Sequence, residues 1–461
     1  MVRGAGAFSL GRLLSRAGAF ILLPVYTRIL TPSEYGVIGF FQVVHDTALA
    51  VVALGLHGAI SRYFFEEGKT EEDIGGFAFA TSAVNVGLGA LIAIVITIAS
   101  LFVDDLAVAS ERVGSWPILP IVAWTVVLHA AIQNVSALYV AQKQFTLTSL
   151  AQFSQFGVGA VASILLILHI DSGAVGKFAG LLIGNGVVLA VFSPRFLRTL
   201  RPTIRLDDIK YALAFGVPTT IYLLANTIHK MFDRLILSGF VGAESLGHYT
   251  LGYMIGMGVM VFTQSFNQAM TPHYFELARD DRRKQLERLI EYWLFGSAFL
   301  FLASFLLVYP LFPLLAPESY QPALSIVPWV FLGYFFNNLY FVFSKGIFYY
   351  KRTKVLPLVT LGSALVNIGL NYLLIPTHGI IGAAIATTVS FAVMAGIGYW
   401  FGRATVQVRY PWGSIALVTV VLLLLAILGP RWWIFTFGGS AMILAFRRQV
   451  VELLNYARTG R

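Results

Sequence analysis

Apolar stretches of membrane-spanning length recur along the whole chain, and they constrain its fold more than any other feature. A helix needs about 20 mostly apolar residues to cross the hydrocarbon core of a bilayer. Fourteen stretches approach or exceed this length: residues 9–30, 36–60, 74–102, 116–139, 146–168, 174–193, 211–238, 247–271, 291–314, 322–344, 355–375, 379–402, 412–429 and 431–447. Only 12% of the residues are charged, against about 25% in an ordinary soluble domain. The sequence therefore predicts an all-α polytopic membrane protein with about 14 transmembrane helices.

The positions of lysine and arginine predict the orientation of these helices, because cytoplasmic loops carry the excess of positive charge. With the N-terminus inside, 24 of the 32 Lys and Arg residues fall in cytoplasmic segments. Four lie on the opposite side, and four lie within predicted spans: Arg12, Arg16, Lys230 and Arg234. Residues 9–30 lack a signal-peptide cleavage pattern and are expected to be a retained first helix. Both termini are therefore expected in the cytoplasm.

Several functional classes are excluded by what the sequence lacks. It has no cysteine, and no spacing typical of metal ligands, so neither thiol chemistry nor a metal centre is expected. The segment YFFEEGKT at 63–70 ends like a phosphate-binding loop, but Tyr63 occupies the position of its first glycine. The longest outer loop, about 102–116, is too short for a catalytic domain. We expect a transporter without catalytic residues, cofactor or nucleic-acid partner.

An internal repeat divides the predicted spans into two halves. TRILTPSEYG after the first span resembles DRLILSGFVGAESLG after the seventh, and GAVG at 173–176 resembles GIIG at 379–382, at a common offset of 206 residues. Chance recurrence of glycine-rich turns is the alternative, but two matches at one offset favour the repeat. We expect an N-lobe at 1–193, a basic cytoplasmic linker at 194–210, a C-lobe at 211–402, and two further spans with a tail at 403–461. An even number of spans per half gives a pseudo-two-fold axis along the membrane normal.

Two arginines in the first span are costly in a bilayer. Burying a guanidinium in hydrocarbon costs roughly 2.5–3.5 kcal/mol or more, and the group cannot escape by losing its proton. Arg12 and Arg16 are one turn apart on one helix face. They either snorkel to the inner surface or line a water-filled cavity where they meet an anionic ligand. The second interpretation is favoured for the pair, because snorkelling is easy for Arg12 but strained for Arg16, which lies about a turn deeper.

The seventh span carries a long polar stripe. Seven polar side chains fall within an arc of about 140° at 100° per residue: Thr219, Tyr222, Asn226, His229, Lys230, Asp233 and Arg234. Such a stripe cannot face lipid, so it is expected to face a cavity. Asp233 could pair structurally with Lys230 or Arg234, or could serve transport, and the sequence leaves both open.

Further ionisable groups lie in the second span, where Gln42 and Asp46 are separated by four residues and His45 adjoins Asp46. Asp46 could neutralise Arg12 or Arg16, or could bind a coupling proton or cation, and the sequence does not separate these roles. His57 and His129 are lone histidines, expected to be packed or hydrogen-bonded.

The charge balance within the spans indicates the kind of ligand. Arg12, Arg16, Lys230 and Arg234 outnumber Asp46 and Asp233 by two. The forked donors of arginine bind phosphate oxygens in pairs. The predicted pathway therefore prefers an anion, and uncharged polar residues such as Tyr222 and Asn226 would add hydrogen bonds to it.

Three segments carry a resemblance to a known family: LPVYTRILTPSEYG (23–36), LGLHGAISRYF (54–64) and KVLPLVTLGSALVNIGLNYLLIPTHGIIGAAIAT (354–387). They resemble the polysaccharide transporter family, the O-antigen and exopolysaccharide (Wzx-like) flippases of the MOP superfamily. The resemblance implies the MOP flippase fold, two six-helix lobes around a central cavity plus two C-terminal helices. It also implies a bacterial or archaeal cytoplasmic membrane protein of lipopolysaccharide or other polysaccharide biosynthesis, which moves undecaprenyl-diphosphate-linked oligosaccharide from the inner to the outer leaflet. Arg12 and Arg16 match the cationic cavity of this family by location.

The resemblance also implies partners and leaves alternative functions open. Membrane lipids and glycan polymerase or assembly proteins would be the partners, and H+ or Na+ the possible coupling ion. Lipid II (peptidoglycan precursor) flippases and MATE-type ion-coupled multidrug exporters have similar outlines. A MATE-type exporter of cations would need acidic groups in its cavity. The two arginines of the first span argue against such an exporter. A membrane-embedded glycan polymerase would need a larger outer loop.

Overall fold

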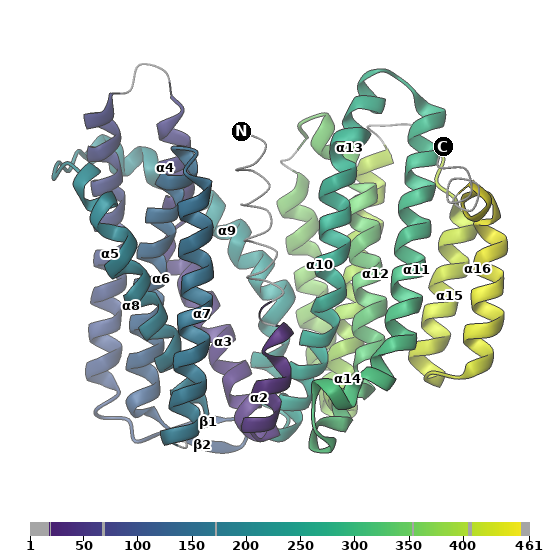
Figure 1. Cartoon of the computed structure of the whole chain (residues 1–461), viewed down its shortest axis with the longest axis horizontal. Coiled ribbons are helices and arrows are strands. Elements are labelled where there is room, and N and C mark those ends of the chain that lie inside the picture. Colours follow the sequence, from purple (N-terminus) through teal and green to yellow (C-terminus); the bar gives the residue numbers. More distant parts are fainter. Residues whose placement is uncertain are drawn as a thin grey trace. The chain divides into compact units, whose positions relative to one another are not determined.

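The computed structural model describes residues 18, 20–66, 70–170, 173–352, 355–403 and 408–452. The chain divides into two compact units, Met1–Gly247 and His248–Arg461, whose elements carry the labels shown in Figure 1. Both units are built almost wholly of helices. The predicted all-α class is confirmed.

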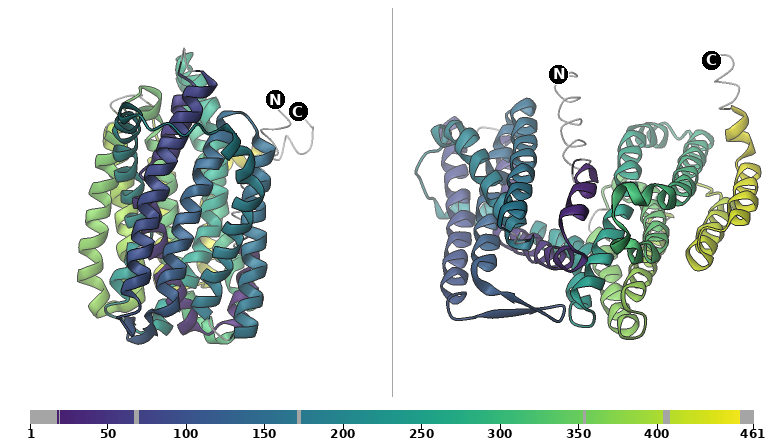
Figure 2. Two further views of the ribbon diagram at one scale, coloured as in Figure 1. Left: turned by 90° about the vertical axis from the view of Figure 1, so that its left-hand side faces the viewer. Right: turned by 60° about the horizontal axis from the view of Figure 1, so that its bottom comes forward.

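The first unit contains eight helices and a hairpin among the described residues. The helices are α2 (Leu23–Ile29), α3 (Pro32–Ala53), α4 (Leu56–Phe64), α5 (Glu71–Ala99), α6 (Ser115–Ala141), α7 (Phe145–Ile170), α8 (Gly173–Thr199) and α9 (Leu206–Leu237), followed by the start of α10 (Ala243–Arg279). Strands β1 (Asp105–Val108) and β2 (Glu111–Gly114) pair antiparallel, with Asp105 opposite Gly114. This hairpin joins the ends of α5 and α6 (Figure 2) and occupies the longest predicted outer loop.

The second unit holds most of α10 and the remaining elements. These are α11 (Arg283–Leu315), the 3-10 helix η1 (Glu318–Ser325), α12 (Val327–Phe343), α13 (Lys345–Tyr349), α14 (Leu356–Arg403), α15 (Trp412–Leu428), the π-helical turn η3 (Ile434–Gly438) and α16 (Gly439–Ala445). Helix α14 covers two predicted spans, 355–375 and 379–402. It bends at Gly379, whose φ of 54° and ψ of −131° are not helical.

Helix boundaries follow local sequence signals. In α3 the Thr31 side chain accepts from the Glu34 backbone N–H and the Glu34 side chain from the Thr31 N–H, with Pro32 in the first turn. Thr70 and Asp73 form the same capping box at α5. The predicted span 36–60 is not one helix, because Leu54 and Gly55 adopt left-handed backbone angles and separate α3 from α4.

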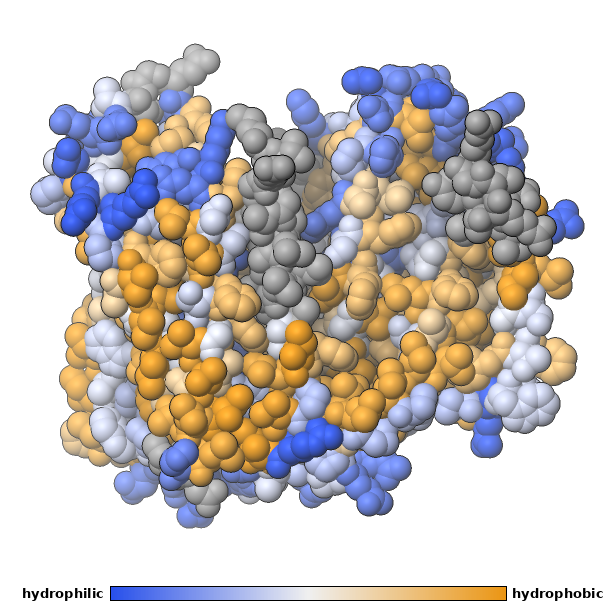
Figure 3. Space-filling model, in the orientation of Figure 1, coloured by the Kyte–Doolittle hydropathy of each residue, from blue (hydrophilic) through white to orange (hydrophobic). Residues whose placement is uncertain are grey.

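Membrane-spanning capacity is confirmed for many of these elements. Among the described residues, seven helices are long and apolar enough to cross a bilayer, and η1 with α12–α13, bent by 46°, would make an eighth. Exposed apolar side chains cover helix α5, including Leu91, Val95 and Ile98 at 53–60% exposure. Figure 3 shows apolar surface along the helices and hydrophilic residues near their ends. A polytopic membrane protein is the only class that accommodates such surface; the number fourteen and the two-fold symmetry stay predictions.

Close helix packing in the first unit depends on small residues. Helices α7 and α8 pack along a face formed by Gly176, Gly180 and Gly184. A Cβ built on Gly180 would lie 2.3 Å from the backbone nitrogen of Ser163, and one on Gly184 would lie 2.8 Å from Cα of Gly159. The spacing of these glycines in the sequence predicts this contact, which is typical of membrane helix pairs.

The two turns that the repeat equates also touch each other. A Cβ on Gly36 would lie 2.0 Å from the carbonyl oxygen of Ala243, and one on Gly247 would lie 1.8 Å from that of Pro32. The first turns of α3 and α10 therefore cross at their glycines.

Basic residues of predicted cytoplasmic segments lie together within each unit. The predicted linker 194–210 forms the end of α8 and the start of α9. The Arg201 N–H donates to the Gly75 carbonyl at 3.2 Å, and Arg205 lies 3.4 Å from Asp73. In the second unit, the Arg409 N–H donates to Glu287 of α11 at 2.9 Å. The predicted loops thus share one end of each unit, while the side of the membrane that this end faces stays a prediction.

Candidate functional site

Most of the predicted cavity residues lie outside the part of the structure that can be described. Arg12 and Arg16 precede the described residues, and the side chains of Tyr222, Asn226, His229 and Lys230 on α9 are also outside them. Their roles stay predictions. Asp46, Asp233 and Arg234 are described.

A cluster of polar groups, which we call the histidine cluster, lies between α3 and α6. It consists of Gln42, His45, Asp46 and His129. One carboxylate oxygen of Asp46 accepts from Nε2 of Gln42 and from Nδ1 of His45, each at 2.9 Å. The side chain of Asp46 is 28% exposed, whereas that of His45 is only 4% exposed. The carboxylate is therefore held by its own helix and is still partly accessible.

His129, expected to be a lone histidine that is packed or hydrogen-bonded, has a second histidine beside it. Its ring lies 5.6 Å from the ring of His45. The second ring nitrogen of His45, Nε2, is buried and has no hydrogen-bond partner among the described residues. The cluster thus continues from a partly exposed carboxylate through one imidazole to a second on a different helix. His57, in contrast, is half-buried on α4, away from this cluster, and its Nδ1 has no partner in the described structure.

Asp233 and Arg234 are both deeply buried, at 2% and 4% exposure. The Asp233 carboxylate accepts from the backbone N–H of Arg234 at 2.8 Å. Arg234 lies in the last turn of α9, where a cation offsets the partial negative charge of the helix C-terminus. It also interacts electrostatically with buried Tyr35 of α3. Pairing of Asp233 with Lys230 lies outside the described residues.

The second unit contains a buried cation that sequence reasoning missed. Lys345 directly follows the predicted span 322–344 and is expected in a cytoplasmic segment, but the structure places it at the start of α13 with 5% exposure. Its ammonium donates to the Thr271 hydroxyl and lies 5.2 Å from the ring centroid of Trp293. Among the described residues, no Asp or Glu oxygen lies within 4.0 Å of it. Its position was misjudged because its solvent access depends on how α10, α11 and α13 pack.

Hydrogen bonds fix the surroundings of Lys345, and we call the group the lysine cluster: Thr271, Trp293, Ser297, Asn338 and Lys345. The Trp293 indole donates to Asn338 at 3.2 Å, and Asn338 donates to the Ser297 hydroxyl at 2.8 Å. These bonds hold the indole below the ammonium, an arrangement that stabilises a cation. A sequence signal did exist: apolar residues flank Lys345 on both sides in FVFSKGIFYY.

Many of the other amides in spans bind neighbouring helices rather than line a lumen. Gln155 of α7 donates to Asn185 of α8 at 2.8 Å. Asn85 of α5 and Asn134 of α6 exchange hydrogen bonds at 3.0–3.2 Å. Buried Asn367 likewise reaches Thr387 across the bend of α14. These pairs stabilise helix contacts in the bilayer interior.

Comparison with known proteins places the chain in a family. The sequence profile described as "Polysaccharide biosynthesis protein" matches residues 1–278, well over half of the chain, and a MatE profile matches residues 218–373. The chain belongs to the polysaccharide biosynthesis protein family. One relative is the Lsg locus putative protein 1 of Haemophilus influenzae, 25% identical, covering 82% of this chain and 93% of that protein. Another is the probable low-salt glycan biosynthesis flippase Agl15 of Haloferax volcanii, 20% identical, covering 88% and 84%.

Solved structures show the fold of this polysaccharide biosynthesis family member. The lipid II flippase MurJ in an inward closed conformation matches with a TM-score of 0.72 at 15% identity, covering 98% of this chain and 99% of that one. An inward-facing MATE family transporter of the MOP superfamily matches with a TM-score of 0.66 at 16% identity, covering 86% and 94%. The predicted MOP fold is confirmed.

Proposed function

We propose that this protein is a lipid-linked oligosaccharide flippase, which moves an undecaprenyl-diphosphate-linked glycan from the inner to the outer leaflet by alternating access. The observation that carries the proposal is the family match over residues 1–278 in a chain with the MOP fold. The name of its archaeal relative, a probable glycan biosynthesis flippase, supports the same substrate class. Glycan polymerase and assembly proteins would take up the product.

The cations predicted within the spans suit a diphosphate ligand. Two phosphates and a sugar chain cannot cross hydrocarbon unaided, and cations in the pathway would compensate their charge. Arg12, Arg16, Lys230 and Arg234 are the proposed binding cations on the first and seventh spans. Buried Lys345 adds a cation with no acidic partner among the described residues.

Three further polar residues of the seventh span would complete the binding site. Tyr222 and Asn226 are the proposed donors to sugar or phosphate oxygens. His229, between them and Lys230, is the proposed site where protonation adjusts the charge of the stripe.

Coupling to an ion gradient is the second part of the proposal. Asp46 would bind the coupling H+ or Na+, because its carboxylate is partly exposed and is joined to His45, with His129 beyond it. Linked ionisable groups inside a helix bundle are typical of proton relays. Asp233, with 2% exposure, would instead serve as a structural charge.

The test is surface glycan export in cells that lack their own flippase. The wild-type chain is expected to restore export, and Arg16→Ala to lose it at equal protein level. Removal of a charge-assisted contact costs about 1.5–3 kcal/mol, roughly ten- to a hundredfold in affinity. Arg28→Ala is the matched control, since that exposed arginine on α2, which donates to the Pro24 carbonyl at 2.8 Å, is not among the proposed binding cations. Normal export by Arg16→Ala would remove this arginine from the site.

A lipid II flippase is the second candidate, favoured by the coverage of MurJ over nearly the whole chain. Lipid II also carries a diphosphate, so the charges do not distinguish the two substrates. Growth of cells depleted of their lipid II flippase distinguishes them. Rescue of growth without glycan export would overturn the proposed substrate. Drug resistance without either rescue would indicate a MATE-type exporter.

A further inference from the structure

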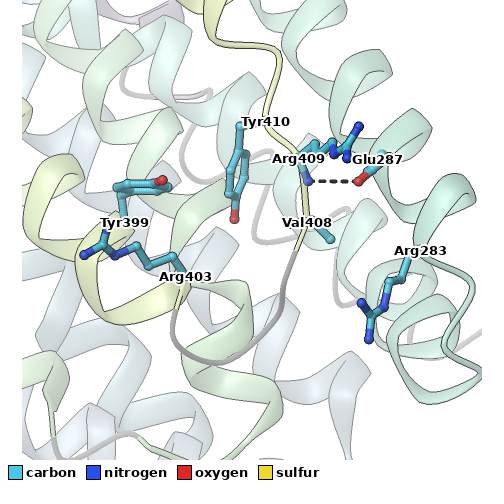
Figure 4. A pocket seen from close by; sticks show the side chains of 7 residues that line it. All are labelled: Arg283, Glu287, Tyr399, Arg403, Val408, Arg409 and Tyr410. Atoms are coloured by element: carbon cyan, nitrogen blue, oxygen red, sulfur yellow. Dashed lines mark hydrogen bonds between the residues drawn. The ribbon is translucent and has the colours of Figure 1, made fainter.

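A pocket in the second unit lies apart from both clusters described above. It has a volume of about 470 Å³ and is lined by seven residues from three elements: Arg283, Glu287, Tyr399, Arg403, Val408, Arg409 and Tyr410. The first two lie in the first turns of α11, the next two at the end of α14, and the last three in the segment before α15 (Figure 4). This size is within the range of ligand pockets in proteins, which is about 300–1,000 Å³.

The pocket has an excess of positive charge. Three of the lining residues are arginines, and a single one, Glu287, is acidic. This carboxylate accepts from the backbone N–H of Arg409 at 2.9 Å. In the described part of the chain, Arg403 and Arg409 have no acidic oxygen within 4.0 Å, whereas Arg283 pairs with exposed Asp281 at 2.9 Å. Two guanidinium groups are thus available to an anion.

Aromatic side chains lie beside Arg403 and Tyr410. The Arg403 guanidinium lies 4.0 Å from the ring centroid of Trp400. The Tyr410 ring lies 5.8 Å from that of Tyr399 and 6.0 Å from that of Trp412. Burial and the neighbouring Tyr399 raise the pKa of Tyr410, so its hydroxyl stays protonated and can donate to an anion. Tryptophan and tyrosine gather at the headgroup level of membrane proteins.

Apolar surface adjoins the pocket. Trp400 and Trp412 are 61% and 47% exposed, and Phe401 of α14 is 38% exposed. Further along α15, Val420 and Ile427 are also exposed, at 52% and 60%. A ligand with an anionic head and apolar tails would use the arginines and this surface together, whereas a free anion would use only the arginines.

We propose that this pocket binds the phosphate-bearing headgroup of an anionic phospholipid of the surrounding leaflet, with its acyl chains on the exposed residues of α14 and α15. The arginines and the Tyr410 hydroxyl hold the phosphate. Basic pockets between membrane helices at the cytoplasmic side recognise anionic headgroups in this way. The site lies within the second unit and does not depend on the transported substrate.

The test measures lipid binding to the purified full-length protein by native mass spectrometry, with phosphatidylglycerol and zwitterionic phosphatidylcholine as probes. The double variant Arg403→Gln/Arg409→Gln is expected to bind phosphatidylglycerol about 30-fold more weakly, since each arginine near an anionic headgroup contributes about fivefold. Arg288→Gln is the matched control, because it removes one exposed charge from α11 outside the pocket lining. It is expected to bind like the wild type.

Each other outcome overturns the proposal. Equal losses in the double variant and in Arg288→Gln would show general surface attraction. Equal binding of phosphatidylcholine would show that the net negative charge of the headgroup is not recognised. Displacement of the lipid by millimolar inorganic phosphate, with no role for acyl chains, would show a site for a free anion. If the glutamine variants misfold, Arg403→Lys/Arg409→Lys keeps the charge and is expected to retain most phosphatidylglycerol binding; complete loss there would also overturn the proposal.

Discussion

Replacement of Gly180 by alanine tests how closely α7 and α8 pack. The added Cβ would lie 2.3 Å from the Ser163 nitrogen and 2.5 Å from its Cα, whereas ordinary contacts begin at 3.4 Å. The helices must therefore separate locally by about 1 Å, and overpacking of this kind costs about 1–3 kcal/mol. The Ser163 hydroxyl, which donates to the Lys177 carbonyl at 2.9 Å, is also displaced. The greater helix propensity of alanine offsets about 1 kcal/mol of this cost.

The measurement is the melting temperature of the detergent-purified protein. Gly186→Ala is the matched control, because it lies on the same helix with no atom within 4 Å of the added Cβ. Gly186→Ala gains the helix propensity of alanine without a clash, so its melting temperature should equal or exceed that of the wild type. Gly180→Ala should melt below the wild type, by about 2–4 °C for each kcal/mol of lost stability in a unit of this size. Adding Ser163→Ala to Gly180→Ala removes the nearest obstructing atom, the Ser163 Oγ at 2.2 Å, but should not restore full stability, because the Ser163 backbone nitrogen and Cα still lie at 2.3 and 2.5 Å. Equal melting of the two glycine variants would refute the packing argument.

The remaining predictions concern charge and orientation. Lys345→Met is expected to lower glycan export and to preserve or raise the melting temperature, because the substitution removes a desolvated buried ammonium. If the lysine is purely structural, the variant would instead be less stable, by about 0.5–2 kcal/mol for the lost cation–π contact. Asp46→Asn is expected to abolish the dependence of export on the proton gradient in a folded protein. Gln42→Leu, which removes only one hydrogen bond to that carboxylate, should keep the dependence, and a gradient-dependent Asp46→Asn would exclude coupling at this position. Reporter fusions after Arg205 should report the cytoplasm and those after Ser319 the outside; an outside signal at Arg205 would contradict the predicted orientation.

Much of the architecture could be predicted because the bilayer imposes it locally. A segment inside lipid must satisfy its own backbone hydrogen bonds, so apolar length alone indicates a helix. The helices of the structure accordingly lie at the predicted stretches from 36–60 to 431–447. The three glycines four residues apart on α8 also revealed a packing face, because a helix places such residues on one side. Helix ends within a continuous apolar stretch were harder to predict: nothing in the apolar pattern separated α3 from α4 at Leu54 and Gly55.

The sequence by itself thus determined the class and the helices, since these depend on residues close together in the chain, and it predicts an excess of cations within the spans. The tertiary structure alone decided which distant side chains meet. It placed His129 beside His45, buried Lys345 against Trp293 and Thr271, and joined Arg409 to Glu287. Helical periodicity specifies the face on which a residue lies but not the helix that covers it. Burial and partnership of a charged group depend on that covering helix, which is selected by packing among segments far apart in sequence.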